Sequence, residues 1–78
     1  MPNVILRMPK AAVSMQTGVI GQWLVEDGAC VTEGQLIYEL EIEKTMVEIE
    51  APTSGVLKQI AVTGESYNVG EIIGEIIG

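Results

Sequence analysis

Histidine is absent from this chain, and Cys30 is the single cysteine among its 78 residues. A disulfide needs two thiols, and ordinary zinc sites need histidine or several cysteines, so neither kind of cross-link is predicted. A catalytic thiol is not expected either, because no histidine is present to activate Cys30. The acidic residues have no spacing typical of a cation site. The fold must therefore be stabilised mainly by apolar packing.

Basic residues are also scarce. Four lysines and arginines stand against eleven aspartates and glutamates, which gives a net charge of −7. The four are scattered along the chain and cannot neutralise a row of phosphates, so nucleic acid is excluded as a partner. No apolar run is long enough to cross a bilayer, and the opening Met1–Lys10 lacks the apolar core of a secretory signal. We therefore expect a cytoplasmic protein without a membrane partner.

Aliphatic residues and frequent breaks dominate what is present. Hydrophobic residues make up 47% of the chain, and only Trp23, Tyr38 and Tyr67 are aromatic. β-Branched side chains favour strands, and nine glycines and three prolines divide the chain into short segments. No window has the periodicity of an amphipathic helix. The sequence predicts one all-β domain over residues 1–78, with strands near 4–8, 17–26, 35–42, 45–51, 55–62 and 71–77.

The two halves of the chain resemble each other. Three blocks of the first half recur in the second in the same order: residues 8–9 as 51–52, 18–25 as 55–62, and 28–37 as 64–73. The first half holds six extra residues before Gly18. Short glycine-aliphatic segments look alike in many β proteins, but the kept order of three blocks favours a true repeat. A repeat of two units predicts quasi-twofold symmetry around a shared core.

A change in the apolar pattern predicts a hairpin around Lys44. Before this lysine, apolar residues fall on the even positions Leu36, Tyr38, Leu40 and Ile42, and after it they fall mainly on odd positions, at Val47 and Ile49. A strand alternates its faces with a period of two, so the change indicates that the chain reverses within one sheet. A two-residue turn at positions 43 and 44 gathers the apolar groups on one face and leaves a wet, acidic face on the other. It pairs Ile42 with Thr45, Leu40 with Val47, Tyr38 with Ile49, Glu41 with Met46 and Glu39 with Glu48.

The residues of this turn are unusual for their position. Two-residue hairpin loops prefer Asn-Gly or Asp-Gly, whose central residues adopt positive φ, and Glu43-Lys44 has no such advantage. Folding alone therefore does not explain the choice of residues. A side chain at this point projects into solvent from a rigid scaffold.

The same residues resemble a known attachment motif. Glu41-Ile42-Glu43-Lys44-Thr45 is similar to the lipoyl-attachment motif of 2-oxo acid dehydrogenase complexes, typically Glu-Thr-Asp-Lys-Ala. The similarity extends over essentially the whole chain and includes residues 31–35, 51–55 and 69–73. The chain thus resembles a lipoyl domain, of the biotin/lipoyl attachment family, from an acyltransferase component. That family has a flattened barrel-sandwich hybrid fold of two antiparallel sheets with quasi-twofold symmetry, and the resemblance implies the same fold here.

The resemblance also implies roles for particular residues. Lys44 would carry lipoic acid through an amide bond, attached by a lipoate ligase or lipoyl transferase that recognises Glu41, Glu43 and Thr45. In the family, the surface loop between the first two strands lies near the lysine and helps the decarboxylase to recognise its carrier. Here that loop consists of Lys10, Ala11, Ala12, Val13, Ser14, Met15 and Gln16.

The implied partners are the enzymes of such a complex. They are a thiamin-dependent 2-oxo acid decarboxylase, an acyltransferase and dihydrolipoamide dehydrogenase. The lipoyl group would act as a swinging arm that shuttles acyl groups and reducing equivalents between their active sites. The domain itself would be a monomeric, non-catalytic carrier. The sequence leaves open which 2-oxo acid is served and whether the domain is free-standing or belongs to a larger acyltransferase.

Two alternatives to a lipoyl carrier stay open. A biotinyl carrier domain of a carboxylase shares this fold and would bear biotin on Lys44. Biotin domains usually have methionine on both sides of the lysine, where this chain has Glu43 and Thr45. An unmodified barrel-sandwich module would serve as an interaction piece, with Lys44 as an ordinary solvated charge.

Packing roles are predicted for the other conspicuous side chains. Trp23 takes the place of Ile60 in the repeat, so we expect it to pack within the sheets rather than to bind a ligand. Met8, Met15 and Met46 are expected to fill gaps in the packing rather than to form an interaction surface.

Overall fold

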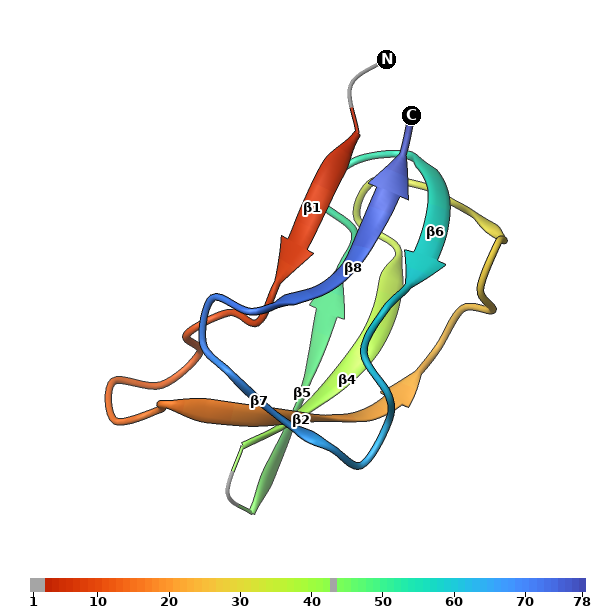
Figure 1. The fold of residues 1–78 in the computed structure, drawn as a ribbon. Helices are drawn as coiled ribbons and strands as arrows, with labels where there is room; N and C mark the ends of the chain where they lie inside the picture. The colour runs from red at the N-terminus through yellow and green to blue at the C-terminus, as the bar shows by residue number, and fades with distance from the viewer. Residues whose placement is uncertain (1–2, 43) are drawn as a thin grey trace.

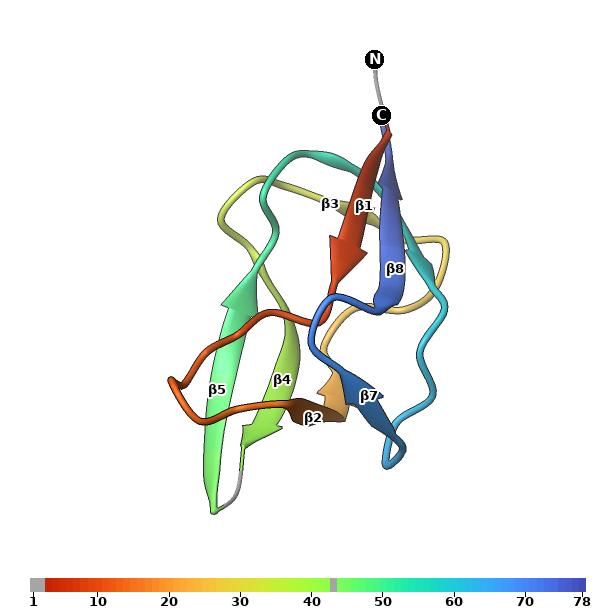
Figure 2. The ribbon, with the colours of Figure 1, turned by 60° about the vertical axis from the view of Figure 1, so that its left-hand side comes forward.

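Eight strands form two antiparallel sheets in the computed structural model, which describes residues 3–42 and 44–78 (Figure 1). They are β1 (Val4–Arg7), β2 (Thr17–Trp23), β3 (Cys30–Val31), β4 (Leu36–Ile42), β5 (Thr45–Glu50), β6 (Gly55–Gln59), β7 (Ser66–Asn68) and β8 (Ile72–Ile77). One sheet has the strand order β1-β8-β6-β3 and the other the order β5-β4-β2-β7 (Figure 2). Among the described residues the sheets are not closed into a barrel, and no helix is long and apolar enough to cross a membrane. The predicted all-β sandwich is confirmed.

The two sheets are related by the repeat that the sequence predicts. Adding four to each strand number, with β1 counted again after β8, converts the order β5-β4-β2-β7 into β1-β8-β6-β3. Each strand of one sheet therefore has its counterpart at the same place in the other sheet. Equivalent hydrogen bonds recur as well. The Gly28 amide donates to the Leu57 carbonyl at 2.7 Å, and the Gly64 amide donates to the Ile20 carbonyl at 3.0 Å. These four residues occupy matching positions in the aligned blocks, so the quasi-twofold symmetry is confirmed.

The same glycine turn leads into β4 and into β8. Gly34 and Gly70 have φ of 87° and 94°, a region that side chains with a Cβ rarely adopt. The Gly34 amide donates to the Ala51 carbonyl and the Gly70 amide to the Met8 carbonyl, each at 2.9 Å. Positive φ therefore lets the chain turn sharply, and each turn forms a hydrogen bond to the Met8-Pro9 or Ala51-Pro52 block of the other half. In the first half this turn sets the start of β4.

The core lies between the sheets and repeats in the two halves. Ile20 and its counterpart Leu57 are fully buried, as are Ile37 and its counterpart Ile73. From Tyr38 to Leu40, β4 buries the face that alternation in the sequence indicates, but Leu36, predicted on that face, is 39% exposed because the register shifts between Leu36 and Tyr38. The largest fully buried side chains are those of Met8, Ile20, Ile37, Leu40, Leu57, Ile73 and Ile76.

Strand lengths differ from the prediction in two ways. β2 and β6 end at Trp23 and Gln59, earlier than predicted, because the backbone leaves the regular hydrogen-bonded ladder at these two points. Beyond those points the amide of Leu24 donates to the Ile37 carbonyl, and the amide of Ala61 donates to the Ile73 carbonyl, both at 2.9 Å. β3 and β7 are two and three residues long, too short to show the alternation on which the sequence prediction depends.

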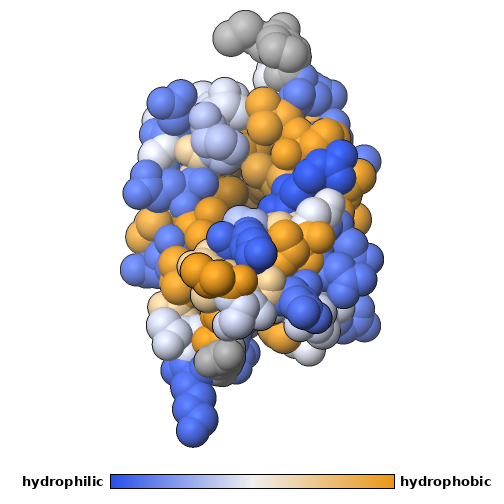
Figure 3. All heavy atoms as spheres, turned by 90° about the vertical axis from the view of Figure 1, so that its left-hand side faces the viewer, coloured by the Kyte–Doolittle hydropathy of each residue, from blue (hydrophilic) through white to orange (hydrophobic). Residues whose placement is uncertain are grey.

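The chain ends and the hairpin of β4 and β5 lie at opposite ends of the molecule (Figure 1). The body is elongated, with extents of 34 × 20 × 19 Å. The protruding end of the hairpin is hydrophilic, whereas apolar side chains gather higher on the same face (Figure 3). The hairpin is therefore the part of the body that reaches farthest from the two termini.

Candidate functional site

The β4–β5 hairpin has the predicted register. Ile42 lies opposite Thr45, Leu40 opposite Val47 and Tyr38 opposite Ile49. Two residues therefore connect the strands, and the second of them, Lys44, lies in the turn with its side chain exposed. Glu43, expected to contribute to ligase recognition, lies outside the described residues.

The inner face of the hairpin is fixed by burial. Leu40 is fully buried, and only 2% of the Tyr38 surface is exposed. The ring of Tyr38 packs against that of Trp23, whose indole nitrogen donates a hydrogen bond to the Ala61 carbonyl at 3.2 Å. Burial raises the pKa of Tyr38 to about 12. Trp23 thus packs within the structure, as predicted, and it ties the foot of the hairpin to the segment that follows β6.

The outer face of the hairpin is acidic and accessible. Glu41 lies opposite Met46, and Glu39 lies opposite Glu48, as the sequence predicts. Like charges directly opposite each other in a sheet are destabilising, and they are tolerated here because water reaches this face. Met46 differs from the expectation of gap filling, since 47% of its surface is exposed. Its methyl group reaches across β4 and covers Gly21 of β2, where an added Cβ would lie 2.5 Å away.

The residues expected to flank the lysine in ligase recognition are accessible. Glu41 and Thr45 are both exposed, and they lie on either side of the turn in adjacent strands. This end of the two-stranded ribbon thus presents a carboxylate, a hydroxyl and the Lys44 amine together.

The loop of residues 10–16 is folded rather than extended. The Met15 amide donates to the Ala12 carbonyl at 3.1 Å, and the Ala11 amide donates to the Met15 sulfur at 3.4 Å. The Val69 amide donates to the Gln16 carbonyl at 3.0 Å, which ties the end of the loop to the second half of the chain. These bonds give the loop a defined shape.

Residues of this loop differ in what they offer to a partner. Val13 is 95% exposed, an unusual position for an aliphatic side chain. Met15, by contrast, is only 6% exposed and belongs to the core, as does Met8. The predicted gap-filling role is therefore confirmed for these two methionines. Lys10, Ala11, Ser14 and Gln16 are exposed, and Ala12 is half-buried.

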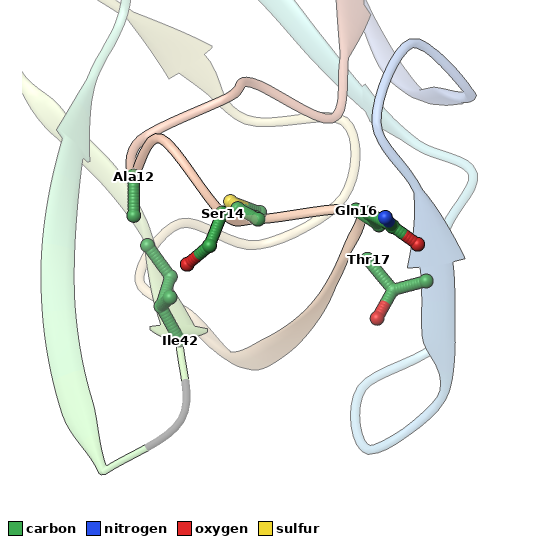
Figure 4. Close-up of a pocket in the computed structure, with 6 residues that line it drawn as sticks. Ala12, Ser14, Gln16, Thr17 and Ile42 are labelled. Carbon is green, nitrogen blue, oxygen red and sulfur yellow. The ribbon is translucent and has the colours of Figure 1, made fainter.

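The loop lies beside the last residue of β4. Ala12, Ser14, Met15, Gln16, Thr17 and Ile42 together line a pocket of about 280 Å³ (Figure 4). Sequence reasoning assigned no such role to Thr17 and Ile42. The alternation of β4 places Ile42 on the apolar face next to the turn, but it gives no sign that the loop would fold against that position.

Among the described residues, no three histidine, cysteine, aspartate or glutamate side chains are grouped so as to hold a metal ion. The feature suited to covalent chemistry at this end is the exposed primary amine of Lys44, presented by a ribbon whose inner face is anchored in the core.

Comparison with known proteins identifies the family. The family model described as "Biotin-requiring enzyme", the biotin/lipoyl model, matches residues 4–76. The chain is 42% identical, over 91% of its length, to the dihydrolipoyllysine-residue succinyltransferase component of the 2-oxoglutarate dehydrogenase complex of Bacillus subtilis. It is 34% identical, over 92% of its length, to the dihydrolipoyllysine-residue acetyltransferase component of the acetoin cleaving system of Pseudomonas putida.

A third relative is the dihydrolipoyllysine-residue acetyltransferase component of the pyruvate dehydrogenase complex of Zymomonas mobilis, 29% identical over 96% of the chain. The chain spans only 17–20% of the length of these three relatives. The match of the family model covers nearly all of the chain, and the observed fold and exposed hairpin lysine agree with it. The chain therefore belongs to the biotin/lipoyl attachment domain family.

Proposed function

We propose that Lys44 is the attachment point of lipoic acid and that the domain is a swinging-arm carrier in a 2-oxo acid dehydrogenase-type complex. The observation that carries the proposal is the exposed lysine in the two-residue turn between Ile42 and Thr45. It is supported by relatives named as dihydrolipoyllysine-residue acyltransferase components of such complexes. A lysine on a rigid, protruding ribbon can enter a ligase active site without unfolding the body.

The site fits the group chemically. The amide forms when the neutral Nζ of Lys44 attacks the carbonyl carbon of an activated lipoyl group; the leaving group departs and the amine loses a proton. When bound, the group supplies a disulfide that accepts an acyl group and two electrons. The domain contributes presentation rather than catalysis. A tether of this kind raises the local concentration of the arm at each active site without tight binding.

Other residues at this end have recognition roles in the proposal. Glu41 and Thr45, together with Glu43, identify the turn to a lipoate ligase or lipoyl transferase. The loop of residues 10–16 identifies the carrier to a thiamin-dependent decarboxylase, and its exposed Val13 is suited to contact a partner. The remaining partners are the acyltransferase and dihydrolipoamide dehydrogenase of the complex.

Biotin attachment is the second candidate function. It is considered because the matching family model is described as "Biotin-requiring enzyme". Biotin would also be held through an amide on Lys44. The residues on either side of Lys44 favour lipoic acid, because neither Glu43 nor Thr45 is the methionine usual in biotin domains.

Mass spectrometry separates the candidates. The chain is co-expressed in turn with a lipoate ligase and with a biotin ligase, each with its cofactor supplied, and intact and peptide masses are measured. A lipoyl adduct on Lys44 supports the proposal, whereas a biotin adduct or no adduct overturns it. Lys58→Arg is the matched control, because it removes an exposed lysine from β6 and must leave the adduct in place.

A further inference from the structure

The six residues that the first half has in excess of the second are not needed to form a sandwich half. The second half builds an equivalent sheet without them, passing from Pro52 to Gly55 in three steps. In the first half these residues belong to the loop between β1 and β2, which forms the 280 Å³ pocket with Ile42. The loop of the extra residues, and the pocket that it forms with Ile42, therefore lie at the end of the body that bears Lys44.

The position of Met15 in the pocket lining is fixed by hydrogen bonds and by packing. Met15 forms part of the lining and is held in place by two hydrogen bonds: its amide donates to the Ala12 carbonyl, and its sulfur accepts from the Ala11 amide. Gly18 makes room for Met15, since a Cβ at position 18 would lie 2.6 Å from the methionine methyl carbon. Substitution of Gly18 would therefore displace Met15.

The lining combines apolar and polar groups. Ala12, Met15 and Ile42 supply methyl groups and a polarisable sulfur, and Ser14, Gln16 and Thr17 supply polar groups. The Ala12 and Ser14 side chains lie on the same side as that of Ile42, whereas Gln16 and Thr17 lie on the other (Figure 4). The apolar part of this lining, formed by Ala12, Met15 and Ile42, suits a compact ring of carbon and sulfur, because thioethers and aliphatic carbons make favourable dispersion contacts with it.

The pocket is within reach of the lysine. Ile42 lies two residues before Lys44 in the chain, a separation of about 7 Å along an extended strand. A lysine side chain lengthened by an acyl chain exceeds this separation, so its end can fold back over Ile42. A pocket volume near 300 Å³ is at the lower limit of ligand sites, which matches a ring of five atoms rather than a larger group.

We propose that this pocket is a resting site for the dithiolane ring carried on Lys44, an inference that rests on the proposed function. The ring packs between Ile42 and the loop when the arm is idle, and leaves when a partner enzyme binds the tip. A short flexible tether gives an effective concentration in the millimolar range, so a pocket with a Kd of about 1 mM is filled roughly half of the time. Such weak binding shields the disulfide without holding the arm back from its partners.

Methyl NMR of the lipoylated chain tests the inference. The chain is labelled with ¹³C at the methyl groups of methionine and isoleucine, and spectra are compared before and after lipoylation. We expect the Met15 and Ile42 methyl signals to shift, and nuclear Overhauser contacts to join them to the dithiolane protons. Shifts confined to the turn, without these contacts, would overturn the resting site.

Two substitutions in the loop provide the matched comparison. Ala12→Phe fills the pocket from its half-buried position, whereas Ala11→Phe adds the same ring at an exposed neighbour that does not line it. The contacts should vanish in the first variant and persist in the second. Reduction of the dithiolane by a soluble phosphine should be about twofold faster in Ala12→Phe than in Ala11→Phe, as half-occupancy requires. Equal rates and unchanged contacts would contradict the inference.

The unmodified chain gives a readout that does not depend on these variants folding. Free lipoamide titrated into it should shift the same Met15 and Ile42 signals with a Kd in the millimolar range, and a titration without such shifts would count against the pocket. Mass analysis separates this failure from that of the proposed function. A lipoyl adduct on Lys44 without pocket contacts overturns the resting site alone, whereas absence of the adduct overturns both.

Discussion

Trp23 and Tyr38 are cross-strand partners whose ring centroids lie 5.3 Å apart, with their planes inclined by 58°. Tilted aromatic pairs at this distance contribute about 0.5–1.5 kcal/mol beyond the burial of their surfaces. The pair joins β2 to β4, and the indole hydrogen bond extends the connection to Ala61. The end of the hairpin away from Lys44 is therefore anchored to the rest of the fold. The burial of Tyr38 in this anchor can be tested through the pH dependence of stability.

Stability should depend on pH in the alkaline range through Tyr38. Burial raises the pKa of Tyr38 from 10.0 to about 12, so the folded state favours the neutral phenol. The contribution of this residue to the free energy of unfolding is complete below pH 10 and is lost as the pH rises toward 12. In urea titrations the wild type should lose about 1–2 kcal/mol more than Tyr38→Phe across this range. Equal pH slopes in the two proteins would contradict the burial of this side chain.

Gly70→Ala should destabilise the fold by about 1–2 kcal/mol because alanine does not readily adopt the φ of 94° found there. No atom lies within 4 Å of an added Cβ, so the cost arises from the backbone and not from a clash. Gly34→Ala should cost a similar amount, since its turn is equivalent. Chemical denaturation measures both effects. Gly70→Asn is the control and should recover part of the loss, because asparagine tolerates positive φ better than alanine.

Lys44→Arg should abolish modification while leaving the fold intact. The side chain is exposed in the turn, and exposed substitutions of this kind usually change stability by less than about 0.5 kcal/mol. Thermal unfolding and intact mass after co-expression with lipoate ligase provide the two measurements. A large fall in melting temperature would show that the lysine side chain packs against the body, contrary to its exposure.

Val13→Ser should reduce recognition by the cognate decarboxylase without affecting lipoylation. This side chain is 95% exposed, so its replacement leaves the core unchanged and stability within about 0.5 kcal/mol. The measurement is the rate of reductive acylation of the lipoylated domain. Ile5→Ser is the matched control, because Ile5 is an exposed aliphatic residue of β1, outside the loop. A similar loss of rate in both variants would argue against a specific role for the loop.

The hairpin and the repeat were predictable because each leaves a periodic trace in the sequence. The change of apolar parity around Lys44 fixed both the turn and the register, and the pairing of Leu40 with Val47 confirms it. The repeat was visible because matching turns need glycine at matching positions, as the φ angles of Gly34 and Gly70 show.

The remaining features depend on contacts that no local pattern records. β3 and β7 exist because their few residues pair with β6 and β2, which are distant in sequence. The same gap-filling role was predicted for Met46 and Met8, because both are methionines. Met46 nevertheless covers Gly21 on the outer face instead of entering the core. The pocket beside Ile42 arises where a loop with its own hydrogen bonds meets the end of a strand, and neither segment alone indicates it.

The position of the termini, at the end of the body away from the Lys44 turn, has a practical consequence for fusions. An affinity tag, a fluorescent protein or a surface anchor joined to either terminus would sit behind the working tip instead of crowding it. If the chain is immobilised through its termini, its body, 34 Å long, would separate the Lys44 amine from the surface. The amine would then be accessible to enzymes in solution.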